Sequence, residues 1–154
     1  MDTGTAYGRL QPSFRSELTL VEPGTPMGEL LRRYWHPVGL SGDANGVPRR
    51  VRVLGEDLIL FRDGRGRPGL VYPRCAHRGA SLYYGMVEER GIRCCYHGWL
   101  YDVDGHCLEQ PCEEGGGARR DKVASRRATT WSALRKPHST VNFLFVSGLG
   151  RGHM

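Results

Sequence analysis

Short apolar-rich runs, some continuous and some interrupted by polar residues, recur through the middle of this 154-residue chain between turn-forming residues. Such runs are typical of β-strands. The strands expected from them cover residues 51–54, 58–61, 70–72, 99–103 and 106–108. Gly55-Glu56-Asp57 would turn the first two into a hairpin, and Asp104-Gly105 is typical of a two-residue hairpin loop between the last two. The pattern predicts an all-β protein with antiparallel strands.

A different pattern precedes the strands. Thr25 is a favoured helix N-cap, and Pro26 is favoured at the first helical position. Four apolar residues then recur at helical spacing: Met27, Leu30, Leu31 and Tyr34. The sequence therefore predicts a short amphipathic helix over about residues 26–34, ended by Pro37. His36 is interpreted as a packed or surface residue rather than a ligand.

The charge of the chain is unevenly distributed. The formal net charge is +6, but residues 1–117 hold 14 Arg, no Lys and 15 acids, a balance of −1. Residues 118–154 hold 8 basic residues and one acid, Asp121, a balance of +7. Since the whole excess lies in this tail, the basic composition does not predict nucleic-acid binding. The composition also changes abruptly beyond Val123, so the tail is expected to be disordered or the product of a frameshift.

Two short segments carry the candidate chemistry, Cys75-Ala76-His77 and Cys94-Cys95-Tyr96-His97. Each offers one thiolate and one imidazole from a single stretch of chain. A [2Fe–2S] cluster in which two His replace two Cys on one iron requires this donor set. The metal ligands predicted on this basis are Cys75, His77, Cys94 and His97.

Zinc is an alternative metal for two Cys and two His. Zinc-finger spacing, however, pairs Cys with Cys and His with His, whereas both pairs in this chain are mixed. The first pair is also separated by only one residue. A zinc-binding interaction module is kept as an alternative, after the two electron-transfer functions given below. It predicts a colourless protein.

The residues around these segments, 74–82 and 94–99, resemble the Rieske domain of aromatic-ring-hydroxylating oxygenase large subunits. Residues 24–38 resemble the N-terminal lead of the phthalate-dioxygenase-like branch, and the resemblance spans roughly residues 17–123. It implies a Rieske-type antiparallel β-sandwich with two cluster-binding loops, a short N-terminal helix and an irregular basic C-terminal tail. The expected divisions are a lead at 1–36, a Rieske [2Fe–2S] domain at 37–117 and the tail at 118–154.

Five flanking residues are expected to support the cluster or its ligands: Arg78, Gly79, Tyr96, Gly98 and Trp99. Glycine beside a ligand lets backbone N–H groups approach the sulfurs, and the other three would orient the imidazoles and exclude water. Respiratory Rieske proteins carry an extra Cys in each loop and a Ser after the second His-Gly, whereas Ala80, Tyr96 and Trp99 stand at those positions in this chain. Fewer donors to the sulfurs predict a potential at the low end of the Rieske range of about −150 to +300 mV.

The resemblance implies one-electron transfer as the N-terminal part of an aromatic-ring-hydroxylating oxygenase. The expected electron donor is an NAD(P)H-dependent reductase carrying flavin and iron–sulfur, or a ferredoxin, and the family suggests a homo-oligomer. The alternative is a stand-alone Rieske ferredoxin, a smaller protein that does not need the roughly fifty residues before the first strand. No membrane partner is expected. An odd number of cysteines outside the ligand set, and no apolar leader, predict the cytoplasm.

A catalytic iron site is not expected within this chain. The family's mononuclear iron needs two His and one carboxylate, but after His97 the chain has only His106, His138 and His153, and no acid follows Asp121. The chain is therefore interpreted as an oxygenase large subunit truncated before its catalytic domain. It is expected to carry electrons and to hydroxylate nothing by itself.

Overall fold

The computed structural model describes residues 15–111, 127–136 and 139–147, the last two stretches by their backbone only. Two short helices come first, α1 at Ser16–Thr19 and α2 at Pro26–Leu31. The strands that follow are β1 His36–Leu40, β2 Arg49–Val53, β3 Glu56–Arg62, β4 Pro68–Val71, β5 Met86–Glu88, β6 Gly91–Arg93, β7 Leu100–Tyr101, β8 Cys107–Glu109, β9 Arg127–Lys136 and β10 Ser139–Ser147. Two 3₁₀ turns, η2 at Ser41–Asp43 and η3 at Leu82–Tyr84, connect them.

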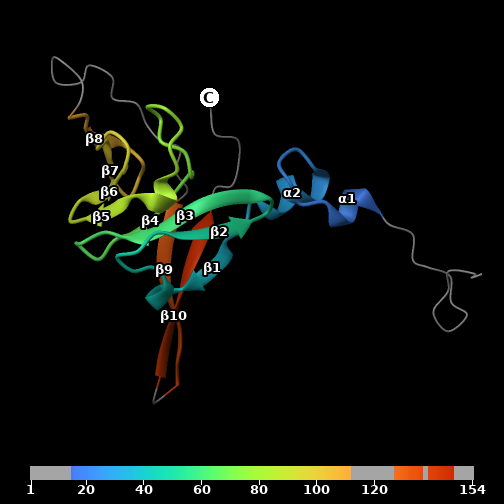
Figure 1. Ribbon diagram of the computed structural model, residues 1–154. Helices are drawn as coiled ribbons and strands as arrows, with labels where there is room; N and C mark the ends of the chain where they lie inside the picture. Colours follow the sequence, from blue (N-terminus) through green and yellow to red (C-terminus); the bar gives the residue numbers. More distant parts are fainter. Residues whose placement is uncertain (1–14, 112–126, 137–138, 148–154) are drawn as a thin grey trace, which may run out of the picture.

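Three antiparallel sheets make up the described structure (Figure 1). Their strand orders are β1-β10-β9, β2-β3-β4 and β5-β6-β7-β8. The all-β antiparallel prediction is confirmed. None of the helices in the described part of the chain combines the length and apolarity needed to cross a bilayer.

Strand β3 is the centre of the fold because both of its faces are buried. Ile59 and Phe61 face one apolar cluster with Ile92, Trp99 and Tyr101 from the β5–β8 sheet and the loop before β7. Leu58 and Leu60 face a second cluster with Ala44 and Leu70. A continuous apolar run such as Leu58-Ile59-Leu60-Phe61 is typical of a strand covered on both faces. The first cluster also contains Cys75 and Cys94, so this packing fixes the candidate site.

The predicted β2–β3 hairpin is confirmed, but its loop is shorter than expected. Val53 pairs with Glu56, which leaves Leu54 and Gly55 as the two-residue loop. Both have positive φ, 47° and 79°. This is the geometry of the hairpin turn whose twist matches that of the flanking strands.

The predicted two-residue loop at Asp104-Gly105 is wrong. The Asp102 N–H donates to the His106 carbonyl at 2.9 Å, and Gly105 N–H donates to the Asp102 carbonyl at 3.0 Å, so three residues form the loop. Of these, only Gly105 has positive φ. The Asp102 carboxylate accepts from the N–H groups of Asp104 and His106, and this capping stabilises the longer loop.

Helix α2 starts as predicted and ends early. The Thr25 hydroxyl accepts from the Gly28 N–H, and Pro26 is the first helical residue. The predicted apolar face is covered only in part: Met27 and Leu31 are half-buried, whereas Leu30 and Tyr34 are 45% and 59% exposed. The most buried residues of this segment are Gly28 and Arg32. His36 is half-buried and its Nε2 lies 2.7 Å from the Leu31 carbonyl, which confirms a packed residue.

Arg32 can be buried because each part of its guanidinium has a partner. Its guanidinium donates to the carbonyls of Val21 and Leu54 at 2.8 and 2.6 Å, and its Nε lies 3.4 Å from Glu56 Oε1. The Tyr72 hydroxyl donates to the other Glu56 oxygen at 2.5 Å. A buried charge is tolerated when it is paired and fully hydrogen-bonded, as this one is.

The prediction of an irregular tail is wrong for the two described stretches. Strand β10 pairs with β9 along its length, and with β1 from His36 opposite Val146 to Leu40 opposite Phe143. The scarcity of acids suggested disorder, but 127–136 and 139–147 are rich in Thr, Val, Phe and Trp, which favour strands. Residues 118–126 of the predicted tail lie outside the described residues.

Replacing Arg32 with Ala should lower the free energy of unfolding by about 3 kcal/mol, because Glu56 then stays buried without its cation. Urea denaturation of the purified chain measures the loss. Arg33→Ala, at an exposed neighbour, is the control and should change stability by no more than about 0.5 kcal/mol. Equal urea midpoints for the two variants would contradict a stabilising role for the Arg32 network.

Candidate metal centre

Two loops with the same backbone closure hold the candidate ligands. Cys75 N–H donates to the Ala80 carbonyl at 2.8 Å, and Gly79 N–H donates to the Cys75 carbonyl at 2.9 Å. In the second loop, Cys94 N–H donates to the Trp99 carbonyl at 2.8 Å, and Gly98 N–H to the Cys94 carbonyl at 3.1 Å. Gly79 and Gly98 have φ of 69° and 73°, the left-handed region that favours glycine. Each loop therefore begins with a Cys and turns back at a Gly four residues later.

An arginine before each Cys reinforces this closure. Arg74 Nη1 donates to the Gly79 carbonyl at 3.2 Å, and Arg93 Nη1 donates to the Gly98 carbonyl at 2.6 Å. The repeated pattern Arg-Cys-x-x-x-Gly is legible in the sequence, but the sequence analysis did not use it. It predicts two loops of equal length, in which only the position of the His differs.

The two arginines differ in their surroundings. Arg93 is half-buried and also pairs with Glu88 at 2.5 Å and with Glu109 at 2.7 Å. Hydrogen bonds from Arg93 lower the pKa of the Glu88 carboxyl, and both carboxylates raise the pKa of Arg93. Arg74 is exposed, and its side chain makes no ion pair with the described residues. The second loop is thus anchored to the β5–β8 sheet, whereas the first presents a free cation to solvent.

The loops bring all four predicted ligands together. Cys75 and Cys94 are 4% and 2% exposed, and the pKa of Cys94 is raised by burial and by the adjacent Cys75 thiol. His77 and His97 are half-buried, with ring centroids 4.4 Å apart and ring planes at 67°. Burial lowers the pKa of His97, and the nearby His77 and Arg78 lower it further, which favours the neutral imidazole.

These residues fit a metal cluster with thiolate and imidazole ligands. His77 Nδ1 is buried and has no hydrogen-bond partner in the part of the chain that the structure describes. Two facing buried thiols are costly to ionise unless a cation neutralises them, and neutral imidazole is the form that binds metal. Backbone N–H groups of Tyr96 and His97 hydrogen-bond to Cys94, which offsets part of that cost.

The flanking residues divide into supporting and exposed groups. The Trp99 ring is buried and stacks on the His77 ring, with centroids 4.8 Å apart and planes at 4°. The Tyr96 ring lies 3.8 Å from the His97 ring but is 62% exposed. Arg78 is exposed and acts on His97 through its charge. Trp99 is thus placed to orient an imidazole, and Tyr96 to cover one only in part.

Tyr101 is the contact that the sequence analysis missed. Its hydroxyl lies 3.1 Å from Cys75 Sγ and accepts from the Ala76 N–H at 3.2 Å, so its proton is free to point at the sulfur. Burial and the Cys75 contact raise the pKa of Tyr101 and keep it protonated. Gly91 packs against its backbone, since a Cβ on Gly91 would lie 1.9 Å from the Tyr101 carbonyl oxygen. Alternation along the strand puts Trp99 and Tyr101 on one face, a signal that could have revealed this contact.

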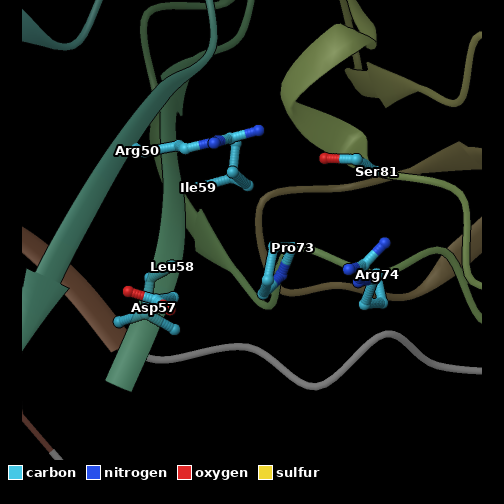
Figure 2. A pocket seen from close by; sticks show the side chains of 7 residues that line it. All are labelled: Arg50, Asp57, Leu58, Ile59, Pro73, Arg74 and Ser81. Carbon is cyan, nitrogen blue, oxygen red and sulfur yellow. The ribbon is translucent and has the colours of Figure 1, made fainter. Parts of the chain in front are cut away.

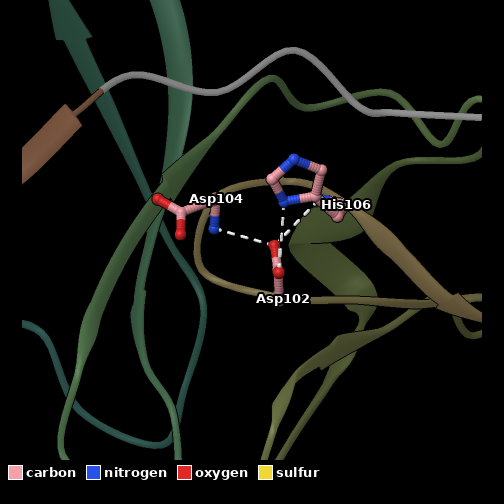
Figure 3. Close-up of side chains that lie close together, drawn as sticks. All are labelled: Asp102, Asp104 and His106. Carbon is pink, nitrogen blue, oxygen red and sulfur yellow. Dashed lines mark hydrogen bonds and ion pairs between the residues drawn. The ribbon is translucent and has the colours of Figure 1, made fainter.

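A second group of metal-ligand types lies on the β7–β8 loop and serves that loop. Asp102, Asp104 and His106 approach one another (Figure 3). Asp102 Oδ2 lies 3.2 Å from His106 Nδ1, its other oxygen caps the N–H groups of Asp104 and His106, and an Asp104 carboxylate oxygen lies within 4.8 Å of both side chains. His106 is exposed, as predicted. The group accounts for the turn and indicates no site.

The remaining described cysteines form no disulfide. Cys95 is exposed and Cys107 is half-buried, with its Sγ 3.5 Å from the Glu109 carbonyl oxygen. Cys112 lies outside the described residues.

Comparison with known proteins gives a consistent picture. Residues 34–128 match the family model described as the Rieske [2Fe-2S] domain. The chain is 64% identical over 118 residues to the phenoxybenzoate dioxygenase subunit alpha of Ectopseudomonas oleovorans, covering 77% of this chain and 29% of that protein. It is 44% identical over 117 residues to the phthalate 4,5-dioxygenase oxygenase subunit of Pseudomonas putida, covering 74% and 27%. The chain thus spans less than a third of the length of these relatives.

Solved structures agree on the fold. The crystal structure of dicamba monooxygenase bound to dicamba superposes with a TM-score of 0.63, covering 75% of this chain and 34% of that one. Its sequence identity is 23%, so this likeness concerns the fold alone.

Replacing Tyr101 with Phe should lower the reduction potential of the metal-loaded protein by ~40 mV. A hydrogen bond to the sulfur stabilises the more negative reduced state, and its loss costs about 1 kcal/mol for one electron. A spectroelectrochemical titration measures the shift. Tyr84→Phe, at an exposed tyrosine, is the control and should leave the potential unchanged. A Tyr101→Phe potential equal to that of the control would show that the hydroxyl does not donate to the sulfur.

Cys94→Ser should abolish nearly all bound iron and the visible colour, whereas Cys95→Ser should retain both. The two residues are neighbours, but Cys94 is buried beside Cys75 and Cys95 is exposed. Iron analysis and absorption spectra of the two purified variants test the assignment. Colour retained in Cys94→Ser and lost in Cys95→Ser would move the ligand to Cys95.

Proposed function

The chain belongs to the Rieske [2Fe–2S] domain family, whose cluster transfers single electrons, and we propose that the four residues gathered by its two loops hold that cluster. The proposed ligands are Cys75, His77, Cys94 and His97. The observation that supports this most strongly is the pairing of two buried thiols with two half-buried imidazoles from loops of identical closure. When bound, the cluster supplies a one-electron couple.

The protein residues contribute position and local polarity. The thiols lie inside the β3 core, where little water reaches them, and the imidazoles lie nearer the surface. Trp99 orients His77 by stacking, and the Tyr101 hydroxyl, 3.1 Å from Cys75 Sγ, would donate to that sulfur once it is a thiolate. Electrons therefore enter and leave at the histidine side, while the core fixes the cysteine side.

Within a larger enzyme, this chain corresponds to the electron-carrying part of an oxygenase subunit acting on an aromatic compound. The match of 118 residues to the phenoxybenzoate dioxygenase subunit is longer than the family domain at 34–128, which favours this over a stand-alone ferredoxin. The proposed electron donor is an NAD(P)H-dependent flavin and iron–sulfur reductase or a ferredoxin. The described cysteines outside the ligand set form no disulfide, which supports a reducing cytoplasm. Homo-oligomerisation stays a prediction.

Absorption and EPR spectra of the chain purified without oxygen, before and after dithionite, test the proposal. The expected protein is red-brown, contains about two irons per chain, and after reduction gives the low-average-g signal of a cluster with histidine ligands. A colourless protein with bound zinc would favour the interaction module instead. Iron bound with the spectrum of an all-cysteine cluster would refute the assignment of the two histidines.

A further inference from the structure

A hollow lies beside the first loop and outside the proposed metal centre. It has a volume of about 260 Å³ and is lined by Arg50, Asp57, Leu58, Ile59, Pro73, Arg74 and Ser81. Strands β2 and β3 form one wall, and the chain on either side of the 75–80 loop forms the other (Figure 2). The side chains of Arg50, Arg74 and Ser81 reach toward one another across its opening.

Arg50 is held in place without losing its charge. Its guanidinium carbon lies 4.4 Å from the centroid of the Tyr83 ring, a cation–π contact. No described carboxylate pairs with it, since the described ion pairs of β2 involve Arg49 and Arg52. Its N–H groups therefore stay available in a fixed fork, which is the arrangement that binds a carboxylate through two parallel hydrogen bonds.

Arg74 and Ser81 add donors on the opposite wall. Arg74 uses one nitrogen on the Gly79 carbonyl, which leaves its other nitrogens facing the hollow. The Ser81 oxygen accepts from the Tyr83 N–H at 3.4 Å, so its own proton is free to donate. The one acid in the lining, Asp57, lies at the other end of the hollow and pairs with Arg52 at 3.5 Å. Two cations and a hydroxyl thus lie at the end of the hollow away from Asp57.

We propose that this hollow receives a carboxylate side chain of the acidic redox protein that delivers electrons to the cluster. The inference rests on the proposed function. Arg74 and Ser81 flank the loop that carries both Cys75 and His77, so a carboxylate bound between them would bring the partner against the loop of one proposed histidine ligand. Electron tunnelling falls steeply with distance, so docking at this position would favour fast transfer. Opposite charges also speed the encounter of two proteins and fix their orientation.

The test measures electron delivery to the full chain by two reductants. One is a purified acidic plant-type [2Fe–2S] ferredoxin, kept reduced, and the other is dithionite, which needs no docking. The variant Arg50→Gln, which leaves the closure of the ligand loop intact, is compared with Arg33→Gln, which removes the same charge from an exposed arginine that does not line the hollow. Stopped-flow absorption under anaerobic conditions follows cluster reduction.

With the ferredoxin at low salt, the hollow variant should react about tenfold or more slowly than the control variant. The difference should shrink at high salt and vanish when the carboxylates of the ferredoxin are converted to amides, because both remove the charge attraction. Dithionite should reduce both variants alike. Equal ferredoxin rates for the two variants would overturn the docking proposal while leaving the cluster assignment intact. A chain that dithionite cannot reduce would instead refute the proposed function itself.

Discussion

The burial of two thiols in the same hydrophobic core is the constraint on which this structure depends. Cys75 and Cys94 come from separate loops, yet they share a cluster of packed residues with Ile59, Phe61 and Trp99. Buried polar groups are costly without partners, and these sulfurs have the Tyr101 hydroxyl and the backbone N–H groups of Tyr96 and His97 beside them; the proposed cluster would neutralise both as thiolates. Strand β3 is buried on both faces, and its Ile59 and Phe61 pack against the cysteines of both loops.

The two loops share their backbone and differ in how they are secured. The second is anchored through Arg93 to Glu88 and Glu109, inside the β5–β8 sheet. The first is held by Arg74, which remains open to solvent. The second loop is therefore held in place by ion pairs, and the first carries an exposed arginine that a charged partner could contact. A carrier needs both properties, because its metal geometry must stay fixed while its partners come and go.

Much of the fold and of the candidate site could be predicted from the sequence, and the wrong predictions have physical reasons. The β2–β3 hairpin, the Thr25 cap and the four proposed ligands follow local rules, and the structure brings them together as expected. The burial around α2 could be read only in part from apolar spacing, because Arg32, which follows the helix, is buried with carbonyl and carboxylate partners while Leu30 stays exposed. Strands β9 and β10 were missed because charge was given more weight than β-propensity.

Gly91 is a position near the site that has no room for a side chain. It has no atom that could reach a metal, and it lies outside both loops. Its backbone nevertheless lies so close to Tyr101 that any side chain would displace the strand whose tyrosine meets Cys75. A search for working relatives that required only the cysteines and histidines would therefore also accept sequences that cannot bring the Tyr101 hydroxyl to Cys75. A glycine on the strand next to that of Tyr101 therefore helps to define a working centre, although it binds nothing itself.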